Sequence, residues 1–133
     1  MQNEKLIKHW AESSDSDFEA MLSNYSAKYY NWALFIGHLV LEKLFKALFL
    51  KTNPNEPQAP LIHNLVTLAK LCNIQPTNEI LQMLGEINSF NIGARYETEK
   101  RAFYVRCTKE YAQQWIEYIK EIREWLRKEL TQE

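Results

Sequence analysis

One apolar stripe in the second quarter of the chain constrains the fold more than any other feature. Its members recur in alternating steps of three and four residues, at Leu34, Gly37, Leu41, Leu44 and Leu48. This spacing places them on one face of an α-helix. We therefore predict a helix over residues 27–51, with Ser26 as a candidate N-cap. Gly37 lowers helix propensity by roughly 1 kcal/mol relative to Ala, which indicates that another helix backbone approaches closely there.

Similar apolar spacing predicts further helices, and the helix breakers separate them. Pro54, Pro57 and Pro60 place a loop over residues 52–60, because proline denies a helix its hydrogen bonds. The run of Ser and Asp over residues 13–17 indicates a bend or a new N-cap within the first helix. No segment alternates as a half-buried strand would. The additional helices are expected over about 4–25, 64–71, 76–93 and 102–130.

The length of the chain limits how these helices can be organised. Its 133 residues suffice for one domain with a sizeable core and are too few for two domains. The connections between the expected helices are short, which favours antiparallel neighbours. We therefore predict a single all-α domain over residues 1–133, an antiparallel helical bundle of about five helices.

Composition excludes several classes of protein. The formal net charge of −1 argues against a strongly basic surface for nucleic acid, although it leaves room for a local basic patch. Cys72 and Cys107 lie far apart in sequence, which predicts free thiols in a reducing compartment. Residues 1–5 are polar, and charges interrupt the longest apolar stretch, 32–50. These features predict a cytoplasmic protein with no membrane association.

The sequence carries no motif of metal, cofactor or nucleophilic chemistry. His9, His38 and His63 are isolated from one another and from both cysteines. No glycine-rich turn precedes a helix, so no phosphate loop is indicated. No serine lies in the elbow context of a hydrolase nucleophile. We predict no bound metal, no cofactor and no catalytic residue.

Charged residues on the long central helix are the first candidates for a binding site. Glu42 precedes Lys46 by four residues, the order that suits an intrahelical ion pair worth a few tenths of a kcal/mol. That modest pair is one interpretation, and the other is that Glu42 reaches across to fix an Arg from another helix. Glu42, Lys43 and Lys46 are therefore ligand-binding candidates.

The segment 91–97 supplies the other two candidates, Arg95 and Tyr96. Gly93 and its polar neighbours indicate a helix end and a turn, which would present both residues at a junction. Arg95 could bind a phosphate or carboxylate, and Tyr96 could stack on a base. Equally, Arg95 could pair with Glu42 while Tyr96 closes the end of the bundle. His63 should begin the short helix, where it could cap that helix or bond to a loop carbonyl.

A basic cluster follows this turn, interleaved with aromatic residues. Its members are Lys100, Arg101, Arg106 and Lys109, with Phe103 and Tyr104 between them. Such a mixture can attract the phosphates of a nucleic acid. It is also expected of a solvated first helical turn, and nearby glutamates dilute it. The solvated turn is the interpretation that the sequence favours.

Taken in chain order, these motifs resemble the HEPN family (higher eukaryotes and prokaryotes nucleotide-binding domain). The resemblance covers almost the whole chain. It rests most on the Glu-Lys-x-x-Lys-Ala core of the second helix and on the Ala-Arg-Tyr turn. The motifs are Trp10 with Asp17-Phe18-Glu19-Ala20, Leu41-Glu42-Lys43-Leu44-Phe45-Lys46-Ala47-Leu48, His63-Asn64-Leu65 and Ala94-Arg95-Tyr96.

The resemblance implies a helical bundle of the nucleotidyltransferase substrate-binding-subunit type that commonly forms a homodimer. Prokaryotic members are often encoded beside, or fused to, a minimal nucleotidyltransferase, in toxin–antitoxin or nucleotide-handling pairs. Many members cut RNA without metal, using an Arg and a His a few residues apart. Here no His follows Arg95, because the last His of the chain is His63. A base and an acid are both needed for that cleavage, so the family chemistry lacks an obvious replacement.

Three hypotheses follow. The first is a non-catalytic, dimeric HEPN module that binds a nucleotide, RNA or a minimal nucleotidyltransferase partner. The second is a metal-independent HEPN ribonuclease with a displaced acid–base group at His38 or His63. The third is a purely structural adaptor bundle, in which a buried Arg95–Glu42 pair would close the fold.

Overall fold

Six helices make up the described part of the chain. The computed structural model describes residues 3–132, and within that range there is no strand. The all-α bundle is thereby confirmed. The helices are α1 (Glu4–Ser26), α2 (Tyr30–Thr52), α3 (Leu65–Leu71), α4 (Asn78–Arg95), α5 (Glu97–Arg106) and α6 (Lys109–Thr131).

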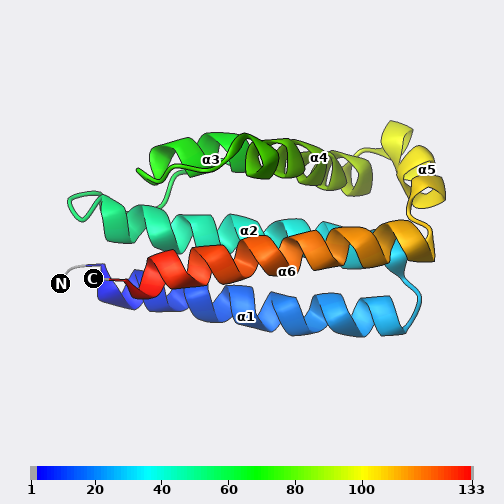
Figure 1. Cartoon of the computed structure of the whole chain (residues 1–133). Coiled ribbons are helices and arrows are strands. Elements are labelled where there is room, and N and C mark those ends of the chain that lie inside the picture. The colour runs from blue at the N-terminus through cyan, green and yellow to red at the C-terminus, as the bar shows by residue number, and fades with distance from the viewer. Residues whose placement is uncertain (1–2, 133) are drawn as a thin grey trace.

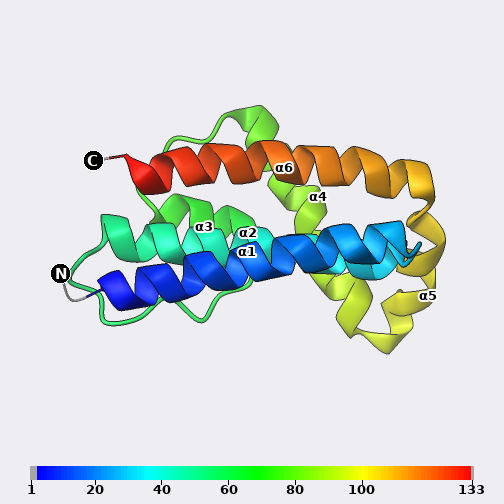
Figure 2. The same cartoon turned by 90° about the horizontal axis from the view of Figure 1, so that it is seen from below.

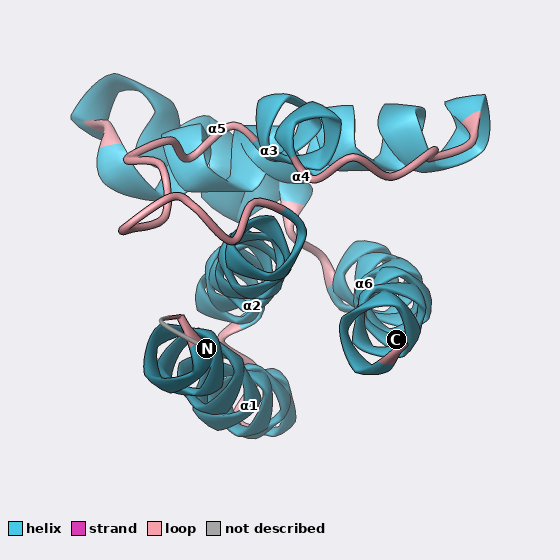
Figure 3. Cartoon of the chain, turned by 90° about the vertical axis from the view of Figure 1, so that its left-hand side faces the viewer, coloured by secondary structure: helices cyan, strands magenta, loops and turns pink. Residues whose placement is uncertain are grey.

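The central helix α2 contacts all five others. Figure 3 shows α2 between α1 and α6 on one side and the layer of α3, α4 and α5 on the other. In Figure 1, α1 runs antiparallel to α2, whereas α6 runs in the same direction as α2 and antiparallel to α1. The reason is that α3, α4 and α5 occupy the other side of α2, and α6 begins beside α5, at the end of the bundle where α2 also begins. Figure 2 shows α4 crossing α2 obliquely. This central position explains why α2 is apolar over most of its circumference.

Close packing at Gly37 confirms one expectation and corrects its detail. A Cβ added at Gly37 would lie 2.5 Å from Ile119 Cδ1 and 3.1 Å from Met21 Sδ. The predicted close approach is therefore real, but side chains of α6 and α1 make it, not another helix backbone. Glycine at this position lets three long helices meet around one point of the core.

The first helix is continuous, so the bend expected over residues 13–17 is wrong. Ser14 is fully buried, and its hydroxyl donates a hydrogen bond of 2.7 Å to the carbonyl of Val40. The serine thus ties α1 to α2 without leaving the helix. Ser26 ends α1 and does not cap α2, which begins after Tyr29. Lys28 adopts a positive φ of 70° in the turn between them.

The last predicted helix, 102–130, is in fact two helices, which brings the count from about five to six. The break falls at Cys107 and Thr108, where the Thr108 hydroxyl accepts a hydrogen bond of 3.1 Å from the Tyr111 amide and caps α6. α5 then folds against α4 by seating Phe103 on Gly93. A Cβ at Gly93 would lie only 2.5 Å from Phe103 Cγ.

Two other sequence expectations concern the thiols and the membrane. Cys72 and Cys107 are both free, as predicted, and both are buried. Burial raises the pKa of each thiol to about 12, so both are protonated at neutral pH. None of the helices described for residues 3–132 combines the length and the apolar character that spanning a bilayer requires.

Candidate functional site

A buried carboxylate, Glu42, is the centre of a polar network on the side of α2 that faces α4. Lys46, one turn further along α2, donates a hydrogen bond of 2.9 Å to Glu42 Oε2, so the intrahelical ion pair forms. Both side chains are almost completely buried. The Lys46 ammonium also lies 5.3 Å from the centre of the Trp10 ring on α1. This pair is therefore more enclosed than an ordinary surface ion pair.

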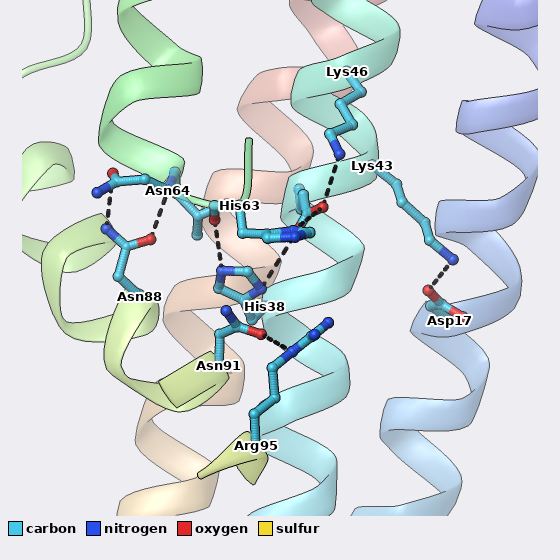
Figure 4. A network of polar contacts seen from close by, with 11 residues as sticks. Asp17, His38, Lys43, Lys46, His63, Asn64, Asn88, Asn91 and Arg95 are labelled. Carbon is cyan, nitrogen blue, oxygen red and sulfur yellow. Dashed lines mark hydrogen bonds and ion pairs between the residues drawn. The ribbon is translucent and has the colours of Figure 1, made fainter. Parts of the chain in front are cut away.

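His63 brings a half-exposed imidazole to the same carboxylate. Its Nδ1 lies 3.0 Å from Glu42 Oε2, while 54% of the side chain remains exposed. Figure 4 shows His63 reaching from the loop before α3 toward α2. Burial raises the pKa of Glu42, but hydrogen bonds from Lys46 and His63 outweigh that effect and hold the pKa below its usual value. Glu42 is therefore ionised and can orient the His63 ring.

His38 lies beneath this pair and holds the loop in place. Its Nε2 lies 3.0 Å from the carbonyl oxygen of His63, and its Nδ1 lies 3.6 Å from Glu42 Oε1. Burial lowers the pKa of His38 to about 4, so the imidazole is neutral at pH 7. Because a carbonyl oxygen can only accept, Nε2 of His38 carries the proton and donates a hydrogen bond to the His63 carbonyl. The unprotonated Nδ1 then faces the carboxylate without a hydrogen bond.

Two asparagines fasten the His63 loop to α4. Asn88 Oδ1 accepts a hydrogen bond of 2.8 Å from the Leu65 amide, and Asn88 Nδ2 donates one of 3.1 Å to Asn64 Oδ1. Asn64 in turn caps α3 by accepting bonds from the Val66 and Thr67 amides. Asn64, and not His63, is therefore the cap of α3. These bonds fix His63 relative to the helix that carries Arg95.

Arg95 lies at the end of α4, beside His38, with its guanidinium accessible to a ligand (Figure 4). Arg95 Nε donates a hydrogen bond of 2.7 Å to Asn91 Oδ1, and the guanidinium lies 5.9 Å from the centre of the Phe35 ring. Within residues 3–132, Arg95 forms no ion pair with a carboxylate. The Arg95–Glu42 pair, one of the two interpretations of the sequence, is therefore wrong, and Lys46 and His63 are the partners of Glu42 instead.

The other two candidates lie apart from this network. Lys43 points to the opposite side of α2, where its ammonium lies 2.7 Å from Asp17 Oδ2 and bonds to Ser13 on α1 (Figure 4). Tyr96 precedes α5 and is 58% exposed, so it does not close the end of the bundle. The structure thus brings together three of the five candidates, Glu42, Lys46 and Arg95.

Sequence reasoning missed several members of the network. His38, Glu42 and Lys46 are spaced four residues apart, so the helical period alone puts them on one face. No sequence pattern predicts the contact between His63 and Glu42, because His63 lies in the loop between α2 and α3 and helical spacing says nothing about a loop. Asn88 and Asn91 also lie three residues apart on α4 and share a face, but amides are too common on helices to draw attention.

The network can bind an anion but is not built for a metal. It combines one ionised carboxylate, two hydrogen-bonded imidazoles and an arginine that donates a hydrogen bond to the side-chain amide of Asn91. An arginine in this setting binds phosphate in a planar fork. Across the described range 3–132, no three His, Cys, Asp or Glu side chains gather as metal ligands.

Comparisons with known proteins place the fold. The sequence model of the HEPN domain matches residues 7–130. The crystal structure of TT1696 from Thermus thermophilus superposes with a TM-score of 0.80 at 15% identity, covering 97% of this chain and 99% of that one. The crystal structure of ST0689, an archaeal HEPN homologue, superposes with a TM-score of 0.72 at 23% identity, covering 94% and 98%. No curated protein matches the sequence significantly.

Proposed function

Because the chain belongs to the HEPN domain family, we propose that it is a non-catalytic binding module that holds RNA or a nucleotide by a phosphate at Arg95. The observation that supports this most is the accessible guanidinium, which Asn91 orients without neutralising it. An arginine kept free of carboxylates retains its full charge for a phosphate ligand. The absence of a His after Arg95 supports a binding role over the cleavage known in the family.

Direct binding measurements test this proposal. Labelled single-stranded RNA and labelled ATP are titrated separately, which distinguishes the two sources of phosphate. Arg95→Ala should weaken binding by about 10- to 100-fold, the loss expected for one charge-assisted hydrogen bond. Arg127→Ala is the matched control, since Arg127 is an exposed arginine that pairs with Glu124 on α6. Equal binding by both variants would remove Arg95 from the site.

We further propose that the module works as a homodimer and partners a minimal nucleotidyltransferase, as the family resemblance implies. Light scattering after gel filtration tests the dimer, which should have twice the mass of one chain. Copurification with a nucleotidyltransferase encoded by a neighbouring gene tests the partner. A monomer at micromolar concentration would contradict the homodimer. Separation of the two proteins on the column would contradict the nucleotidyltransferase partner.

A second candidate function rests on the contact between His63 and Glu42. A half-exposed imidazole hydrogen-bonded to a buried carboxylate is the arrangement of an acid–base catalyst, because the carboxylate orients the ring. Glu42 and His63 could thereby replace the missing His in metal-independent RNA cleavage. RNA is incubated with chelator and wild type, His63→Ala or the control His9→Ala. Cleavage lost only in His63→Ala supports an enzyme, and intact RNA at high protein concentration rejects it.

A further inference from the structure

A small cavity lies next to Arg95, at the junction of α2, α4 and α5. Its volume is about 270 Å³, and Gly93 and Ala94 of α4 form part of its wall. Sites for drug-sized ligands usually occupy about 300–1,000 Å³, so this cavity suits a single planar ring system and not a larger ligand. Ala94, in this wall, directly precedes Arg95, to which the proposed function assigns the phosphate.

The side chains at the mouth of the cavity are those that recognise an unpaired base. Trp32 is 46% exposed and Tyr104 is 63% exposed, so the aromatic rings of both residues are accessible to a ligand. Asn31 offers an amide donor and acceptor beside them. Exposed aromatic rings that are also close to basic groups are the platforms on which single-stranded nucleic acids stack their bases.

Basic side chains on α5 give the same cavity a positive edge. Lys100 and Arg101 both line it. Among residues 3–132, Arg101 has no ion-pair partner, and Lys100 has only the exposed Glu97 at 3.7 Å. Glu99 lies on the other side of α5, in a separate hollow with Arg106. The charge facing the cavity is therefore net positive, although the whole chain is slightly acidic.

An aromatic path connects the cavity to Arg95. The rings of Trp32 and Phe35 meet edge to face with their centres 6.1 Å apart, and the Arg95 guanidinium lies 5.9 Å from the Phe35 ring. A nucleotide whose phosphate lies on Arg95 would thus have a neighbouring base close to Trp32. A single strand could therefore place one phosphate at Arg95 and an adjacent base at Trp32.

From this geometry we propose that the cavity between α2, α4 and α5 binds an unpaired base of a single-stranded nucleic acid. Trp32 and Tyr104 stack on the base, while Lys100 and Arg101 contact the flanking phosphates. This inference rests on the proposed function, which makes the nucleic acid RNA and places one phosphate at Arg95. It deepens that function by naming a single strand as the ligand.

Fluorescence anisotropy with a labelled single strand of oligouridine tests the inference. Trp32→Ala should weaken binding by about 5- to 100-fold, the range for loss of one base–aromatic stack, and Trp32→Phe should recover much of that loss. Tyr104→Ala is the second variant, because its exposed ring contributes little to folding. An oligonucleotide with an abasic backbone should bind wild type more weakly than oligouridine and should bind wild type and Trp32→Ala equally.

The outcomes separate this inference from the function on which it rests. If wild type binds RNA through Arg95 but Trp32→Ala and Tyr104→Ala bind as tightly as wild type, the base site is wrong and the proposed function stands. If wild type binds neither RNA nor ATP, both fail. If the Trp32 and Tyr104 variants convert a dimer into a monomer without changing RNA affinity, a second copy of the chain covers the cavity, and the base site is also overturned.

Discussion

His63 Nδ1 lies 3.0 Å from Glu42 Oε2, so an imidazole from an irregular loop is held by a carboxylate buried in the central helix. The same carboxylate oxygen accepts a bond of 2.9 Å from Lys46. Glu42 thereby links the buried Lys46 of the core to the orientation of the His63 ring.

Breaking the Glu42–Lys46 pair should destabilise the fold strongly. In Glu42→Leu the buried Lys46 ammonium loses its counter-charge, and removal of one partner of a buried pair typically costs about 3–5 kcal/mol. The double variant Glu42→Leu/Lys46→Met removes both charges and should recover most of that loss. Urea denaturation measures each free energy of unfolding. A double variant as unstable as the single one would show that the charge of Lys46 is not the cause.

The buried His38 should make the protein less stable as the pH falls from about 6.5 to about 4. Burial lowers the pKa of His38 from 6.5 to about 4, so the unfolded chain takes up a proton in this window while the folded chain does not. The shift corresponds to about 3 kcal/mol of stability, present above pH 6.5 and lost by about pH 4. The pKa of Glu42 is lowered in the folded protein, so ionised Glu42 also stabilises the fold. That stabilisation is lost at lower pH, as the pH falls below 4.5, the ordinary pKa of glutamate.

The variant His38→Gln isolates that contribution. Glutamine keeps a donor for the His63 carbonyl but does not titrate. The free energy of unfolding of His38→Gln should therefore vary much less between pH 6.5 and pH 4 than that of wild type. Parallel curves for the two proteins would mean that other groups cause the pH dependence.

Two glycines of the same helix should respond in opposite ways to alanine. Gly93→Ala would drive its Cβ into the Phe103 ring, and overpacking of this kind typically costs about 1–3 kcal/mol. Gly85 is exposed on α4 with no atom within 4 Å of its added Cβ, so Gly85→Ala should stabilise the helix by up to about 1 kcal/mol. Thermal melts of both variants test the pair. A neutral Gly93→Ala would refute the tight seating of α5 on α4.

The sequence predicted the fold well because helical period and breakers are local signals. The stripe through Leu34, Leu41 and Leu48 was enough to place α2 at the core. The break at Thr108 was missed because an N-cap threonine within a charged run resembles an ordinary surface residue. Ser14 was misread as a bend for a related reason: its hydrogen bond to the Val40 carbonyl depends on another helix, which the local sequence cannot report.

The candidate site was predicted only in part, since its contacts join distant segments. Arg95 and the Glu42–Lys46 pair were recognised from their motifs, but the motif could not say that Arg95 bonds to Asn91 and not to Glu42. Lys43 shares the motif and nevertheless faces Asp17 on α1, because adjacent residues of a helix point in different directions. The role of His63 depends on the path of the loop that precedes α3.

The central claim, that a phosphate ligand binds at Arg95 in the network that also holds His63, is tested most directly by nuclear magnetic resonance. Single-stranded RNA is titrated into isotope-labelled protein while the Arg95 Nε–H signal and the His63 ring signals are followed. We predict that both shift progressively and saturate together, while the side-chain signals of Arg127 on α6 stay in place. Saturable binding that leaves Arg95 and His63 unchanged, with shifts confined to α6 or α1, would contradict the account.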